Sequence, residues 1–96
     1  MPPRTLLLSA VLLAGCGGAS DTLHVQILPS SYSVGAVRST LATPVVDEVV
    51  RLQPKKVHVS SCHSTPPAKI IQFDRELQAR SRATVTGGFY ETCPES

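Results

Sequence analysis

The sequence predicts one small α/β domain of the α+β type, built as a two-layer sandwich of three to five strands with two helices on one face. Segments typical of strands and of helices alternate along residues 23–96, which favours helical connections between neighbouring strands. Three strand-like segments alternate apolar and polar side chains, so one sheet face should meet water. Both helices are therefore expected on the other face.

The domain is expected to begin with a strand over residues 23–28. The side chains predicted to face its core are those of Leu23, Val25 and Ile27. Pro29 ends this strand. A second, short strand over residues 32–35 is expected to finish in a turn at Gly35.

A helix is predicted over residues 44–53, because apolar residues recur there at spacings of four, four and three. The residues that form this stripe are Leu41, Val45, Val49 and Leu52. Pro44 is tolerated at the first helical position, and Thr43 before it is a suitable N-cap. Asp47 and Arg51 lie one turn apart and are expected to form an ion pair.

A third strand is predicted over residues 57–61, with Val57 and Val59 facing inward. Thr65, followed by two prolines, indicates the capped start of a second helix. A last strand is predicted over residues 83–90, where Gly87 and its glycine neighbour suggest a bulge or a close backbone contact. Ten side chains are predicted to be almost fully buried: Val25, Ile27, Val49, Leu52, Val57, Val59, Ile70, Phe73, Leu77 and Val85.

The N-terminal segment has the order of a secretory signal, with one basic residue (Arg4), an apolar run over residues 6–14 and small residues that lead into Cys16. The ending LAGC at residues 13–16 resembles the lipobox of bacterial lipoproteins. That resemblance implies removal of residues 1–15, a diacylglycerol thioether on Cys16 and anchoring in a membrane. The apolar run is much shorter than the roughly 20 residues that a spanning helix needs.

The resemblance to lipoproteins also implies a location. Residues 16–22 are small and polar and are expected to form a lipidated tether, and residues 23–96 form the domain. Gly17 follows Cys16, whereas an aspartate there resembles the inner-membrane retention signal of enterobacterial lipoproteins. We therefore expect a cell-envelope protein on the periplasmic face of the outer membrane.

Setting Cys16 aside leaves two cysteines, Cys62 and Cys93, in an exported chain. An oxidising compartment and a small core both favour a disulfide between them. Each cysteine follows a predicted strand, so parallel pairing of those strands would bring both to one end of the sheet. This bond would leave no free thiol for catalysis or for a metal.

A short motif pattern runs through the predicted domain, with YSVG at residues 32–35, a helix that contains Leu41, and PxxVxV at residues 54–59. With the second helix and the closing strand, it resembles the periplasmic domains of ExbD/TolR-type biopolymer-transport subunits over residues 23–85. The resemblance implies a binding or dimerising module. That family has a membrane helix with a functional acidic residue, and residues 1–15 contain no acid, so proton-channel function is not carried over.

No enzymatic or metal centre is expected. Cys62 and His63 are adjacent and would project oppositely from a strand, and the chain has no C-x-x-C pair. His58 and nearby serines lack the G-x-S-x-G signature of a hydrolase. We therefore expect no catalytic residues, no metal ligands and no cofactor.

The wet face of the sheet is the candidate interaction face. Its predicted members are His24, Gln26, His58, Ser60, Thr84 and Thr86. Two histidines there would permit a contact that responds to protonation. Lys and Arg total nine against seven Asp and Glu, without a basic run, so no nucleic-acid partner is expected.

The expected function is that of a structural or protein-interaction module in the cell envelope. The expected partner is another envelope protein or a second copy of the chain. The alternative is a lipoprotein that binds a small ligand or a metal on the wet face.

Overall fold

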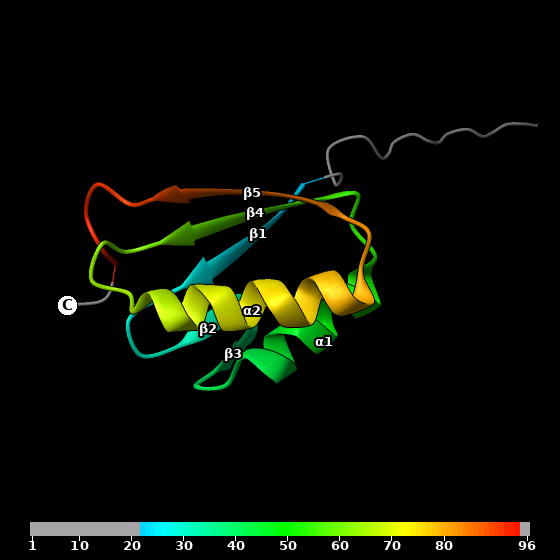
Figure 1. Ribbon diagram of the computed structural model, residues 1–96, viewed down its shortest axis with the longest axis horizontal. Helices are drawn as coiled ribbons and strands as arrows, with labels where there is room; N and C mark the ends of the chain where they lie inside the picture. Colours follow the sequence, from blue (N-terminus) through cyan, green and yellow to red (C-terminus); the bar gives the residue numbers. More distant parts are fainter. Residues whose placement is uncertain (1–21, 95–96) are drawn as a thin grey trace, which may run out of the picture.

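Five strands form one mixed sheet, and two helices cover one face of it (Figure 1). The computed structural model describes residues 22–94. The predictions for Cys16 and the signal segment therefore lie outside the described residues. In chain order the elements are β1 (Thr22–Ile27), β2 (Tyr32–Val34), β3 (Val37–Ser39), α1 (Ala42–Leu52), β4 (Lys56–Ser61), α2 (Pro67–Arg80) and β5 (Thr84–Phe89). This architecture confirms the predicted two-layer sandwich.

The strands lie in the order β3-β2-β1-β4-β5. β1, β4 and β5 are parallel neighbours, as expected when a helical connection separates strands. β1, β2 and β3 are joined antiparallel as a meander. β3 and β5 are therefore the two edges of the sheet.

In the β2–β3 hairpin, the sequence predicts β2 and the turn at Gly35 but not β3. β3 has only three residues and shows no clear alternation of apolar and polar side chains. Val34 and Val37 pair across a two-residue turn. Gly35 takes the first turn position with a φ of 55°, a backbone conformation that glycine adopts without a steric cost. Two tight connections thus place three successive strands side by side.

The first helix begins at Ala42, two residues earlier than predicted. Leu41 is the N-cap residue, and no side chain caps the helix. The prediction that Thr43 is the N-cap is therefore wrong. Because Leu41 precedes the first turn, its side chain is 65% exposed instead of buried. Leu52, at the last turn before left-handed Gln53, is 44% exposed, which corrects a second predicted core position.

The second helix begins at Pro67, after an N-cap at Pro66 that has no capping side chain. The prediction that Thr65 caps this helix is therefore wrong. Its buried hydroxyl accepts a hydrogen bond from the N–H of Cys62 at 3.1 Å and donates one to the carbonyl of Ile27 at 2.9 Å. Thr65 therefore fastens the β4–α2 loop to the end of β1.

The core lies between the sheet and the two helices. Its members are Val25, Ile27, Tyr32, Val34, Ala42, Val45, Val46, Val49, Val57, Val59, Phe73 and Leu77. Seven of the ten predicted core positions are buried. Besides Leu52, the exceptions are Ile70 and Val85. Both are only partly buried, because they lie at the β5 side of the sheet, which the helices leave uncovered.

Two smaller predictions also need correction. Arg51 pairs with Glu48 at 2.6 Å, whereas Asp47 pairs with Arg80 of α2 at 2.6 Å. β5 carries no bulge, since its register with β4 runs without interruption through Gly87. In the part of the chain that the structure describes, no helix is long and apolar enough to cross a membrane.

Candidate interaction surfaces

The sheet face without helices, called the open face below, carries the polar side chains of β1, β4 and β5. Strand register places the six predicted members on this face in three rows. His24, His58 and Thr86 lie side by side, and Gln26 lies beside Ser60. Thr84 lies next to Lys56 at the start of the strands. The structure thus brings the predicted residues together on one surface.

Side chains on the open face satisfy one another. Gln26 donates a hydrogen bond to the Tyr90 hydroxyl at 2.7 Å and accepts one from Ser33 at 2.9 Å. These bonds fix the amide between β2 and the end of β5, beside a shallow basin of about 370 Å³. Sequence reasoning missed Ser33, because pairing of β2 with β1 could not be read from the chain.

The two histidines are register partners on β1 and β4. Their ring centroids are 5.9 Å apart in an edge-to-face arrangement. Nδ1 of His58 lies 2.8 Å from the Thr86 hydroxyl. Among residues 22–94, no group of three or more His, Cys, Asp or Glu side chains is placed to hold a metal ion.

The predicted disulfide is confirmed. Cys62 and Cys93 are bonded, with their Cα atoms 5.3 Å apart. Because β4 and β5 are parallel, both cysteines lie just beyond the same end of the sheet. His63 stacks on Phe89 close by, with ring centroids 4.7 Å apart, so this histidine belongs to the β5 end of the molecule.

A second surface was not predicted, and it results from uneven helix cover. α1 packs on β2 and β3 and against α2, so the helical layer lies towards the β3 side (Figure 1). Five of the six β5 residues are exposed and Val85 is half-buried. Gly87 and Phe89 belong to the same sheet face as buried Val59, yet no helix covers them. The apolar face of β5 is therefore open.

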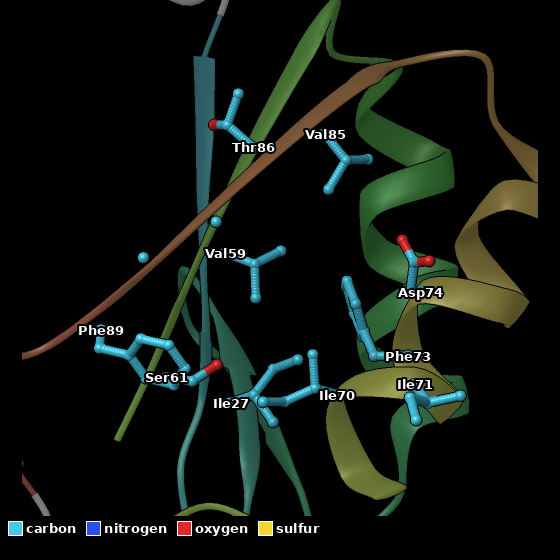
Figure 2. Close-up of a pocket in the computed structure, with 12 residues that line it drawn as sticks. Ile27, Val59, Ser61, Ile70, Ile71, Phe73, Asp74, Val85, Thr86 and Phe89 are labelled. Atoms are coloured by element: carbon cyan, nitrogen blue, oxygen red, sulfur yellow. The ribbon is translucent and has the colours of Figure 1, made fainter. Parts of the chain in front are cut away.

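The uncovered strip forms a groove between β5 and α2, called the β5 groove below, with a volume of about 380 Å³. Apolar side chains dominate its lining: Ile27, Val59, Ile70, Ile71, Phe73, Val85 and Phe89. Figure 2 shows Val59 on the strand side and Ile70 on the α2 side of this space. Ile71 and Phe89 are 53% and 60% exposed, so the groove presents apolar surface to solvent.

The outer edge of β5 adjoins this groove. The N–H of Thr84 donates to the carbonyl of Lys55, just before β4, and the N–H of Tyr90 donates to the carbonyl of Ser61, the last residue of β4. Since successive strand residues point to opposite sides, the main-chain groups of Val85, Gly87 and Phe89 point outward. Within residues 22–94 β5 pairs with β4 and with no other strand.

The β5 edge also lacks the usual protection against pairing. Residues 83–90 contain no charged side chain and no proline. Charged edge residues, prolines and bulges are the devices by which natural sheets prevent edge-to-edge association. The uncharged stretch TVTGGF, last in the predicted alternation, was the sequence signal that could have indicated this surface.

Comparisons with known proteins add no assignment: no family model matches this chain, and no similar curated protein or solved structure was found.

Proposed function

We propose that this chain is a lipid-anchored cell-envelope protein whose domain is a non-catalytic protein-interaction module. One observation carries the proposal: the unprotected β5 edge lies directly beside an apolar groove. An extended segment that adds to such an edge gains affinity from main-chain hydrogen bonds and specificity from alternate side chains that enter the groove.

The geometry defines the chemistry of the segment that fits. Three outward-pointing residues of β5, spaced by two, offer hydrogen bonds to one extended strand. The groove is apolar apart from the Asp74 carboxylate at its margin and two polar strand residues. The partner strand should therefore be uncharged and should carry apolar side chains at alternate positions.

The membrane anchor in this proposal rests on the LAGC motif. Changing Cys16→Ser should abolish labelling by a palmitate analogue and leave the precursor uncleaved. Persistent labelling of that variant would overturn the lipidation of Cys16. A serine at this position keeps the small polar character of the segment, so export itself should continue.

The proposed membrane is the outer one, with the domain facing the periplasm. Density-gradient fractionation of cells that express the chain should place it with outer-membrane markers. Sedimentation with inner-membrane markers would overturn this location. The Cys16→Ser variant is the matched control, because it should move away from the lipidated position in the gradient.

The interaction surface can be tested in cells with a photo-crosslinking amino acid. We expect p-benzoylphenylalanine at position 71, in the β5 groove, to give a discrete protein adduct. At position 52, also apolar and exposed but on α1, it should give none. Adducts from both positions, or from position 84 on the open face alone, would contradict the proposal. The last result would favour the alternative function of the open face.

Main-chain pairing has its own test. Gly87→Pro removes one outward N–H while the ladder to β4 keeps its donors, a placement that sheets tolerate at an edge. The adduct from position 71 should then disappear. An adduct that survives Gly87→Pro would show that apolar contact alone recruits the partner.

A further inference from the structure

We infer that the strand which pairs with β5 is β5 of a second copy of this chain, in an antiparallel arrangement with Gly87 on the twofold axis. This inference rests on the proposed function and names its partner. It follows from the direction of the β5 main chain, the order of its side chains and its lack of charge.

The main chain limits the possible pairings. Val85, Gly87 and Phe89 direct their N–H and C=O groups away from β4. In an antiparallel pair, opposed residues that face each other in this way exchange two hydrogen bonds. With Gly87 opposite itself, Val85 lies opposite Phe89 of the second copy, so all three outward residues are paired.

Neighbouring registers use the edge less well. Placing Thr86 on the axis sets Phe89 opposite Ala83, whose N–H already donates to the Ser81 hydroxyl at 3.1 Å. Placing Gly88 on the axis sets Val85 opposite Glu91, a charged residue beyond the end of β5. The register centred on Gly87 avoids both conflicts.

The side chains agree with the same register. Val85 and Phe89 share the groove face of β5. Val85 of each copy would therefore contact Phe89 of the other there, which is a favourable aromatic–β-branched pair. On the open face Thr86 meets Gly88 of the second copy. Gly87 has no side chain at the axis, so two copies can approach there without a clash.

The symmetry also closes the groove. A twofold axis normal to the sheet makes one continuous sheet and puts the helices of both copies on the same side. The two β5 grooves then face each other, and the exposed side chains of Ile71 and Phe89 are shielded by those of the second copy. Such an isologous contact is self-limiting and stops at a dimer.

The test is sedimentation equilibrium of the full lipidated chain in a large excess of detergent micelles. The native chain should self-associate. Gly87→Asp should raise the dimer dissociation constant about tenfold or more, because two carboxylates would then oppose each other about 5 Å apart. Gly88→Asp is the matched control. Its side chain would face Thr86 of the second copy, and the constant should change less than about threefold.

Both substitutions should leave the monomer folded. A Cβ at Gly87 would lie 3.6 Å from the Val59 carbonyl oxygen, and one at Gly88 would lie 3.7 Å from the His58 ring. Both are ordinary contacts. Circular dichroism and an intact Cys62–Cys93 bond would verify the fold of each variant.

A mixture supplies the decisive measurement. Gly87→Lys alone should also weaken association, whereas a mixture of Gly87→Asp and Gly87→Lys chains should associate again as a heterodimer. Only the residue on the axis can be rescued in this way. Equal weakening by Gly87→Asp and Gly88→Asp, or no rescue in the mixture, would overturn the register.

The inference and the proposed function can fail separately. A native chain that stays monomeric at millimolar concentration, while position 71 still forms a discrete adduct with another envelope protein, would refute the second copy alone. A chain that neither self-associates nor forms an adduct from position 71 would refute the interaction module as well.

Discussion

The two edges of this sheet are built differently. β3 has three residues, carries the charged Arg38 at its centre and lies under α1. β5 has six residues without a charge, and no helix packs over its apolar face. The difference teaches that the helical layer completes one half of the domain and leaves the other half incomplete. One edge is thus covered by a helix, and the other stays exposed.

Two phenylalanines give the sharpest test of this contrast. Phe73, on α2, is 1% exposed, whereas Phe89, on β5, is 60% exposed. Phe73→Ala should lower the free energy of unfolding by about 3–5 kcal/mol, because it removes a fully buried side chain and leaves a cavity in the core. Phe89→Ala should cost about 1 kcal/mol or less.

Chemical denaturation of both variants would measure these values. The comparison breaks if Phe89→Ala is as destabilising as Phe73→Ala, since β5 would then belong to the closed core. Phe89→Ala should instead weaken self-association, which Phe89→Leu, with an apolar side chain retained, should partly preserve.

The disulfide is expected to give the next largest effect. It closes a 31-residue separation and joins the loop after β4 to the segment after β5. Loop-closure entropy predicts a loss of about 3–4 kcal/mol when both cysteines are replaced by alanine. Hydrogen exchange should show that β5 opens before β2 and β3 do.

Reduction of the native chain provides the matched measurement, because it leaves the sequence unchanged. An unaltered melting temperature after full reduction would show that β5 is held by its ladder to β4 alone. Uniform acceleration of exchange across all strands would instead show that the bond stabilises the two halves equally.

A smaller effect is expected from the contact between the helices. Glu76 of α2 accepts hydrogen bonds from Gln72 and from Thr43 of α1, the latter at 2.7 Å, and these bonds hold the pKa of Glu76 below its ordinary value. The stability that they contribute is present above the unfolded-state pKa of about 4.3 and is lost as pH falls through the lower folded-state pKa.

Thr43→Val should raise the pKa of Glu76 and lower stability at neutral pH by a few tenths of a kcal/mol, the scale of a solvent-screened surface interaction. The variant should lose less additional stability than the native chain on acidification. Titration of Glu76 by nuclear magnetic resonance would check the direction. An unchanged pKa would mean that Gln72 and the charge of Arg80 lower it without a contribution from Thr43.

The smallest effect is expected on the open face. His24→Ala combined with His58→Ala should change the free energy of unfolding by about 0.5 kcal/mol or less, because both rings lie at the wet surface. Self-association should also stay unchanged. A strong loss of self-association would move the interaction surface from the β5 groove to the open face.

Sequence reasoning succeeded where the relevant pattern is local. Alternation in β1 and β4 predicted which side chains are buried, because a strand repeats every two residues. The bond between Cys62 and Cys93 could be predicted from the count of cysteines in a chain that is expected to be exported. Each of these inferences needed only neighbours in the chain or a count of residues.

The failures depend on tertiary placement. Leu41 and Leu52 fit the helical period, but periodicity does not fix where a helix begins and ends. Phe89 shares its sheet face with Val85, as the two-residue repeat of a strand requires, yet its exposure depends on how two helices are distributed over five strands. The β5 groove is a property of that distribution and of no single segment.

The bond between Cys62 and Cys93 has a consequence for damage by proteases. The whole of α2 and β5 lies within the covalent ring that it closes. Arg82, exposed in the connection between these two elements, is an accessible cleavage site. A single cut there would leave both fragments attached to each other, so the nicked chain would keep its mass on a non-reducing gel and separate only after reduction.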